Sequence, residues 1–116
     1  FKPVNDRYGH DVGDQLLKEV ASRLRGCVRE SDAVFRIGGD EFALIVNGAV
    51  TEGFCKSRVE KIKAAIREPY RLKDAEVQVG TSCGCAVYPC DSDDVRAIRI
   101  LADHRMYEDK QRSGRS

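Results

Sequence analysis

Hydrophobic positions recur in three stretches of the chain at the three-to-four-residue spacing of an amphipathic helix. Helices are therefore expected over residues 11–28, 55–66 and 95–106. Asp11 is the expected N-cap of the first helix, Pro69 closes the second, and the third fades at Gly114. A shorter helical segment is expected within "FKPVNDRYGH", where Gly9 stops it.

Strand patterns lie between these helices. Apolar runs over residues 33–37 and 41–46 flank Gly38 and Gly39, a pattern typical of a β-hairpin. Residues 70–72 are expected to turn through "KDAE" into one long strand over residues 77–87, where apolar residues alternate with small or polar ones. The order indicates an α+β domain with a mainly antiparallel sheet covered by helices. The chain has no doubly wound β-α alternation, no P-loop and no GxGxxG motif.

Composition narrows the class of protein. The 116 residues suit one domain, and the net charge of +1 gives no field that would attract nucleic acid or an anionic membrane. No apolar run approaches the roughly 20 residues of a membrane span, and no segment resembles a signal peptide. We expect a cytoplasmic domain, whether or not its parent protein is anchored in a membrane. The chain opens on Phe1 rather than Met, which suggests a piece of a longer protein.

The cysteines are five in number, with no CxxC pair. They are Cys27, Cys55, Cys83, Cys85 and Cys90. Cys83 and Cys85 would share one face of a strand, so a thiol or metal pair is conceivable. The favoured interpretation is a set of buried thiols in a reduced cytosolic protein.

The stretch "RIGGDEFALIV" places adjacent carboxylates, Asp40 and Glu41, at the tip of the expected hairpin. Glycine has no Cβ, so the preceding pair would let a nucleotide approach the backbone closely. The two carboxylates repel each other unless a hard divalent cation joins them, and Mg²⁺ prefers one or two carboxylates completed by phosphates and water. The pattern points to phosphoryl or nucleotidyl transfer. Its ordinary alternative is a solvated acidic turn.

Four ordered blocks carry a resemblance to a known family. "GGDEF" stands unaltered at residues 38–42, after "FKPVNDRYGHDVGDQLLKEVASRL" and before "VGTSCGCAVYP" and "ADHRMYEDK". From Phe1 to about Arg115 the chain resembles the GGDEF family of diguanylate cyclases, which condense two GTP molecules into cyclic di-GMP. The resemblance implies a palm-like, ferredoxin-related fold similar to the catalytic domains of class III nucleotide cyclases.

The resemblance implies roles for residues at the tip and on the last helix. Asp40 would be a ligand of Mg²⁺ or Mn²⁺, and Glu41 would bind metal or prepare the ribose 3′-hydroxyl for attack. Gly38 and Gly39 would let the nucleotide lie against the turn. Lys110 would neutralise phosphate charge, although a lone lysine on a helix is usually a solvated residue.

Further substrate contacts are implied near the start of the chain. Phe1 and Lys2 match a segment that approaches the phosphates. Asn5 and Asp14 match a guanine-reading pair, whose amide and carboxylate suit the N1–H and N2–H₂ donors of guanine. Taken alone, Asn5 would be a polar residue at a helix end and Asp14 a first-turn partner of the helix dipole.

The chain departs from the family pattern at both ends. The family's first, central strand ends in a DxD-like motif just before the phenylalanine-lysine pair and supplies a second metal carboxylate. Residues 1–116 begin after that point, so we expect a single domain that lacks this strand and has a sheet gap or an exposed edge. The family's phosphate-binding arginine would fall on Gly114, which leaves Arg112 and Arg115 as candidates.

A second site is implied by "RESD", in which Arg29 and Asp32 match the family's RxxD inhibitory motif. The arginine offers a planar fork to phosphate oxygens, and the aspartate accepts from a guanine edge. The same spacing also forms ordinary surface ion pairs of little energy.

The leading hypothesis is a diguanylate cyclase that uses GTP and Mg²⁺, releases pyrophosphate, acts as a homodimer and is inhibited by its product. Each domain would hold one GTP, so two domains must face each other. The rival is a catalytically silent GTP-binding or dimerisation module that regulates an attached phosphodiesterase or other signalling domain. The intact "GGDEF" favours the enzyme. No nucleic-acid partner and no membrane contact by this domain are expected.

Overall fold

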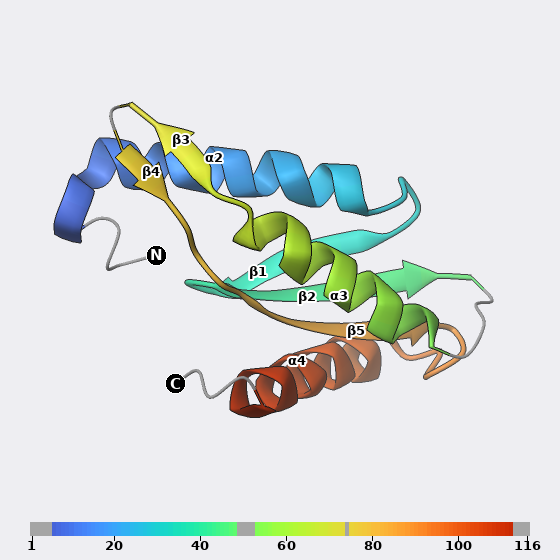
Figure 1. Ribbon diagram of the computed structural model, residues 1–116. Coiled ribbons are helices and arrows are strands. Elements are labelled where there is room, and N and C mark those ends of the chain that lie inside the picture. The colour runs from blue at the N-terminus through green and yellow to red at the C-terminus, as the bar shows by residue number, and fades with distance from the viewer. Residues whose placement is uncertain (1–5, 49–52, 74, 113–116) are drawn as a thin grey trace.

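Helices and strands follow one another in the order expected from the sequence (Figure 1). The computed structural model describes residues 6–48, 53–73 and 75–112. Its elements are α2 (His10–Cys27), β1 (Ala33–Gly38), β2 (Glu41–Asn47), α3 (Phe54–Arg67), β3 (Tyr70–Leu72), β4 (Ala75–Val77), β5 (Ser82–Tyr88) and α4 (Val95–Arg112). Residues 6–8 are also helical, as expected before Gly9. None of these helices is long and apolar enough to cross a bilayer.

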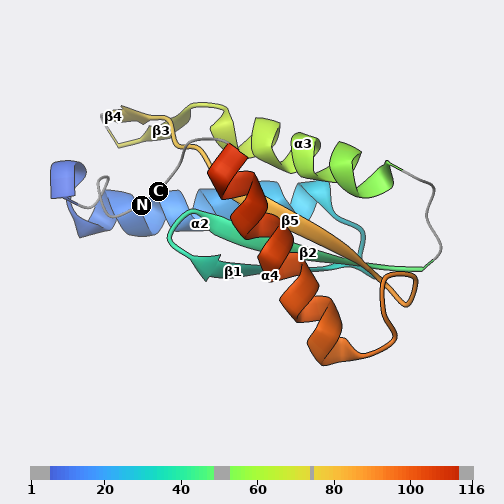
Figure 2. The same ribbon diagram turned by 90° about the horizontal axis from the view of Figure 1, so that it is seen from below.

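The main sheet has the strand order β1-β2-β5 and lies between two layers of helices. Helices α2 and α3 cover one face and α4 covers the other (Figures 1 and 2). β1 pairs with β2 antiparallel, and β2 pairs with β5 in parallel from Glu41↔Ser82 to Asn47↔Tyr88. No gap separates β2 from β5, and β5 is an edge strand of this described sheet. The expected α+β class with a helix-covered sheet is confirmed, but the main sheet is mixed rather than mainly antiparallel because β2 pairs with β5 in parallel.

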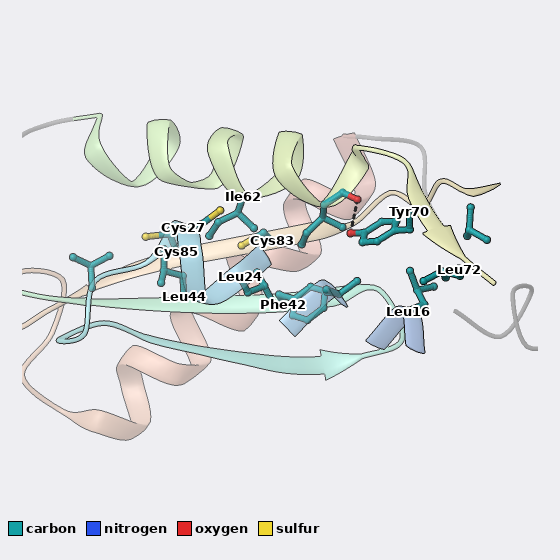
Figure 3. Close-up of a cluster of buried hydrophobic side chains, with 14 of the residues drawn as sticks. Leu16, Leu24, Cys27, Phe42, Leu44, Ile62, Tyr70, Leu72, Cys83 and Cys85 are labelled. Atoms are coloured by element: carbon teal, nitrogen blue, oxygen red, sulfur yellow. Dashed lines mark hydrogen bonds between the residues drawn. The ribbon is translucent and has the colours of Figure 1, made fainter. Parts of the chain in front are cut away.

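The two-residue period of β2 divides the core between the two faces. Phe42, Leu44 and Val46 join the larger cluster with α2 and α3, whereas Ala43 belongs to the cluster under α4. Figure 3 shows the larger cluster, in which the hydroxyl of the buried Tyr70 donates to the carbonyl of Ile66 at 2.7 Å. The alternation of side chains along β2 therefore determines which helices each face of the strand contacts.

Helix α4 approaches the sheet closely because small residues lie beneath it. A Cβ added to Gly84 would collide with the backbone carbonyl of Ala102 and the backbone nitrogen of Met106. Ala43 and Ala86 are fully buried on the same face. The glycine of β5 is thus required by contact with α4 rather than by an unusual φ angle.

The expected N-cap of the first helix is wrong. Helix α2 begins at His10 and its N-cap is Gly9, which has a φ of 93° and makes no side-chain capping bond. The left-handed φ of Gly9 separates the helical residues 6–8 from α2, so the boundary falls earlier than expected. Asp11 instead lies in the first turn, where its negative charge interacts favourably with the positive end of the helix dipole.

The long strand expected over residues 77–87 is also wrong, because it is interrupted at residues 78–81. β4 pairs with β3 in a separate two-stranded sheet, with Tyr70 opposite Val77. The Gln78 side chain then donates to the carbonyl of Arg67 at 3.0 Å. The segment crosses from the small sheet to the large one, and β5 starts only at Ser82.

Candidate functional site

The turn between β1 and β2 carries the glycines and carboxylates predicted from the sequence. Gly38 pairs with Glu41 after a shift of register that follows Arg36, and Gly39 and Asp40 form the turn itself. Nε of Arg36 donates to the carbonyl oxygens of Gly38 and Gly39, both at 3.1 Å. Sequence reasoning missed Arg36, because the apolar pattern of a strand does not predict that a side chain will fold back onto the adjoining turn.

The turn is also fixed to the start of β5. The backbone carbonyl of Asp40 accepts from Oγ1 of Thr81 at 2.6 Å and from the backbone nitrogen of Ser82 at 3.0 Å. Thr81 and Ser82 are both buried. These contacts hold the backbone of Asp40 in place from a segment about forty residues further along the chain.

Glu41 forms an ion pair with Lys110, the lysine predicted to meet phosphate. Nζ of Lys110 lies 3.0 Å from Oε2 of Glu41, and both side chains are about one-fifth exposed. Lys110 lies in the last turn of α4, where a cation also interacts favourably with the helix dipole. The structure thus brings together two of the predicted catalytic residues that are 69 residues apart in the sequence.

The position of the Glu41 carboxylate depends on the absence of a side chain at Gly38. A Cβ added to Gly38 would collide with Oε1 of Glu41. The sequence explained this glycine by the close approach of a nucleotide, and the structure adds that its missing side chain leaves room for the carboxylate.

Asp109 holds α4 in the position that presents Lys110. Its carboxylate is buried, forms an ion pair with Lys63 at 2.8 Å and accepts from the backbone nitrogen of Cys83 at 3.0 Å. Sequence reasoning missed Asp109. A signal existed, since an acidic residue three positions after Met106 continues the apolar stripe of this helix.

The remaining predicted substrate contacts are only partly described. Asp14 is exposed on α2. Figures 1 and 2 show the start of α2, the hairpin tip and the C-terminal end of α4 at the same end of the molecule. Arg112 lies 3.6 Å from the carboxylate of Asp109. The other predicted contacts lie outside the described residues; they are Phe1, Lys2, Asn5 and Arg115.

Arg29 and Asp32 lie at the opposite end of the hairpin from the turn. The guanidinium of Arg29 donates to both carboxylate oxygens of Asp32, at 3.2 and 3.1 Å, and to the carbonyl of Asn47 at 3.2 Å. The backbone nitrogens of Arg29 and Asn47 also donate to Asp32. The pair therefore clamps the loop before β1 onto the end of β2.

The carboxylate of Asp32 is held in its charged form. Burial alone would raise its pKa, but the hydrogen bonds and charge of Arg29 outweigh that effect, so the pKa lies below the ordinary value of 3.8. The Arg29 side chain is 45% exposed while that of Asp32 is fully buried, and the guanidinium carbon of Arg29 lies 5.4 Å from the centre of the Phe54 ring. A ligand could therefore reach the arginine, but not the aspartate, without rearranging the loop.

The donor set at the tip suits a hard cation only in part. Among residues 6–48, 53–73 and 75–112, no group of three or more His, Cys, Asp and Glu side chains is placed to hold a metal ion. Asp40 and Glu41 offer two carboxylates, which fits Mg²⁺ when phosphate oxygens and water complete its shell.

Comparison with known proteins gives the class to which this arrangement belongs. The sequence profile of the family described as "Diguanylate cyclase, GGDEF domain" matches residues 1–116. The chain belongs to the GGDEF domain family.

Curated relatives agree with this assignment. The chain is 42% identical to the bifunctional diguanylate cyclase/cyclic di-GMP phosphodiesterase MucR of Pseudomonas aeruginosa, over 98% of this chain and 17% of that protein. It is 39% identical to the diguanylate cyclase TpbB of the same species, over 97% of this chain and 26% of TpbB. The chain thus spans only about a sixth to a quarter of these relatives.

Solved structures show the same fold. The crystal structure of the GGDEF domain of TpbB (YfiN) from P. aeruginosa matches with a TM-score of 0.79 and 38% identity, covering 96% of this chain and 70% of that one. A sensory box/GGDEF family protein from Caulobacter crescentus matches with a TM-score of 0.77 and 31% identity, covering 95% of this chain and 71% of that one.

Proposed function

We propose that this domain is a diguanylate cyclase that condenses two GTP molecules into cyclic di-GMP and releases two pyrophosphates. The observation that carries the proposal is the hairpin turn of a GGDEF family member, in which the unaltered glycine pair precedes Asp40 and Glu41 and the Glu41 carboxylate contacts Lys110. Diguanylate cyclases among the relatives support this reaction.

In the proposed reaction the tip receives the triphosphate of one GTP. Asp40 and Glu41 would hold Mg²⁺, which supplies Lewis-acid stabilisation of phosphate charge when bound. The 3′-hydroxyl oxygen of one GTP attacks the α-phosphorus of the other, and the bond to pyrophosphate breaks. Glu41 would help to hold metal or prepare that hydroxyl for attack. A second identical step closes the ring.

Lys110 would change partners when the triphosphate arrives. Its ammonium lies on Glu41, at the edge of the turn. The ammonium can exchange a carboxylate oxygen for a phosphate oxygen without losing its anionic partner, since both oxygens accept charge-assisted hydrogen bonds. The lysine would then offset the negative charge that the triphosphate brings, as expected for its predicted role.

Two domains are required because each would hold a single GTP. Alignment of both 3′-hydroxyls with the partner's α-phosphates is a problem of proximity and orientation, which a homodimer solves by facing two tips toward each other. Asn5 and Asp14 would select guanine through its N1–H and N2–H₂ donors.

The decisive test uses Asp40→Ala and Glu41→Ala in the full-length protein. We expect both variants to abolish formation of cyclic di-GMP from GTP and Mg²⁺, measured by chromatography. Asp103→Ala removes an exposed carboxylate elsewhere on α4 and is the matched control, expected to keep normal turnover. Near-normal turnover in either tip variant would refute the assignment.

A second candidate is a silent GTP-binding module that regulates an attached phosphodiesterase. It is favoured by the likeness to the cyclic di-GMP phosphodiesterase PdeR of Escherichia coli, which is 36% identical over 96% of this chain and 17% of PdeR. It would be supported if the wild-type full-length protein bound GTP in calorimetry but formed no cyclic di-GMP.

A further inference from the structure

Two thiols from separate elements meet at the edge of the sheet. Sγ of Cys55, in the first turn of α3, lies 2.6 Å from Sγ of Cys85 in the middle of β5. Both are free thiols, and they are 30 residues apart in the sequence. Figure 3 shows Cys85 within the larger core cluster. Folding therefore brings together two sulfurs that local sequence does not pair.

The two thiols differ in access to solvent. Cys85 is buried, whereas Cys55 is half-buried. Both line a groove of about 740 Å³ between α3, β5 and α4, together with Arg105. A small oxidant that enters this groove would meet Cys55.

The polar surroundings distinguish the two sulfurs chemically. A hydrogen bond from Cys85 lowers the pKa of Cys55 against the opposing effect of burial, and the positive charge of Arg105 lowers it further. The same hydrogen bond and burial raise the pKa of Cys85. Nη1 of Arg105 is fixed there, since it donates to the carbonyl of Cys85 at 2.9 Å and to Asp91 at 3.1 Å. The direction of the hydrogen bond and the greater exposure of Cys55 both favour Cys55 as the nucleophile and Cys85 as the proton donor.

We propose that Cys55 and Cys85 are a redox-active pair, which a hydroperoxide converts into a reversible disulfide between α3 and β5. The Cys55 thiolate attacks one peroxide oxygen, the O–O bond breaks, and the departing oxygen leaves as water or alcohol after protonation. Cys55 is then a sulfenic acid. The Cys85 sulfur attacks it, the S–O bond breaks, and the hydroxyl leaves as water with the proton of Cys85.

In the net reaction, two thiols and one hydroperoxide give one disulfide, one water and one alcohol. With hydrogen peroxide, the products are one disulfide and two waters. A dithiol reductant reverses it by thiol–disulfide exchange. The bond would join the start of α3 to the strand that α4 covers. None of the residues assigned to the GTP site takes part, so failure of this proposal leaves the proposed function standing.

Cys83 is the internal control on the same strand. It faces the same cluster two residues before Cys85, but burial raises the pKa of its thiol to about 12, and the carboxylate of Asp109 adds to the effect. Within the described residues, the hydrogen-bond acceptor of its Sγ is the carbonyl oxygen of Gly84, at 3.9 Å, and not another sulfur. It should therefore remain a thiol under conditions that oxidise the pair.

The experiment treats the native full-length protein with hydrogen peroxide, blocks the remaining thiols in denaturant, and maps the peptides by mass spectrometry after trypsin digestion. Cys55 falls in the peptide of residues 37–56 and Cys85 in that of residues 74–96. We expect these two peptides to be cross-linked and to separate on treatment with dithiothreitol. The peptide of residues 74–96 also contains Cys83 and Cys90, so variants must assign the bond.

The cross-link should persist in Cys83→Ala and Cys90→Ser and be absent from Cys55→Ser and Cys85→Ala. Circular dichroism of each variant confirms that it is folded before oxidation. Two results would overturn the proposal. One is a native wild-type protein in which peroxide oxidises Cys55 without any cross-linked peptide; the other is a cross-link that survives in folded Cys85→Ala.

Discussion

Glu41 shows how much of the candidate site depends on single residues. Its carboxylate has Lys110 on one oxygen, while the other occupies the space that a Cβ of Gly38 would need. Its backbone starts β2 opposite Ser82. Adjacency in the sequence was enough to predict Asp40 and Glu41 as a pair. The contact of Glu41 with Lys110 crosses 69 residues and has no local signature, so sequence reasoning did not anticipate it. The predicted role of Lys110 at phosphate stays a prediction.

Gly38→Ala should separate activity from stability. Gly38 is not one of the glycines with positive φ, so alanine fits the backbone, but its Cβ would push the Glu41 carboxylate away from Lys110. We expect cyclic di-GMP formation to fall at least about tenfold, the effect of roughly 1.4 kcal/mol on a barrier. The free energy of unfolding in urea should change by less than about 1 kcal/mol, because the displaced atom is the end of a flexible side chain. Full activity in a folded variant would contradict this role for Gly38.

At the scale of elements, local periodicity predicted most of the secondary structure because helices and hairpins repeat their pattern within a few residues. The errors arose where contacts between distant residues, or an unusual backbone angle, determine where an element begins or ends. The interruption before β5 depends on Thr81 and Ser82 bonding to the carbonyl of Asp40, which no strand pattern contains. The start of α2 depends on the positive φ of Gly9, which a search for an acidic N-cap overlooks.

Gly84→Ala should destabilise the domain by moving α4. The added Cβ would meet backbone atoms of α4, including the carbonyl carbon of Arg105 at 2.9 Å, and a backbone cannot rotate away as a side chain can. Overpacking of this kind costs about 1–3 kcal/mol, measurable by urea unfolding. Gly26→Ala is the matched control, because nothing lies within 4 Å of its Cβ position in α2. We expect the Gly26→Ala control to be neutral or stabilising by up to about 1 kcal/mol. Equal unfolding curves for the two variants would show that α4 tolerates a methyl group at residue 84, contrary to the prediction.

Across the whole molecule, the two predicted sites occupy opposite ends of one hairpin. The turn with Asp40 and Glu41 is at one end, and the clamp of Arg29 and Asp32 against Asn47 is at the other. Both motifs were recognisable from the sequence, because each is short and contiguous. Their separation follows from the topology, since the loop before β1 and the end of β2 meet where the hairpin opens.

Arg29→Ala should weaken product binding while leaving turnover largely intact. The exposed guanidinium of Arg29 is the accessible part of the clamp, and losing one charge-assisted hydrogen bond costs about 1.5–3 kcal/mol, or roughly ten- to a hundredfold in affinity for cyclic di-GMP. Calorimetric titration of the full-length protein with cyclic di-GMP measures this affinity. Arg25→Ala, an exposed arginine in the last turn of α2, is the control. Unchanged affinity and inhibition in Arg29→Ala would leave the clamp a purely structural feature.

The pairing of β2 with both β1 and β5 limits how a structural change at one end of β2 can reach the other end. A slide of β2 by one residue would turn Phe42, Leu44 and Val46 away from α2 and α3 and into the closely packed face under α4. A one-residue slide of β2 is therefore unfavourable, whereas a tilt of the whole hairpin keeps its pairing register. We therefore expect that a ligand at Arg29, if it affects Glu41 at all, would do so by tilting the whole hairpin, which would displace the turn relative to Lys110.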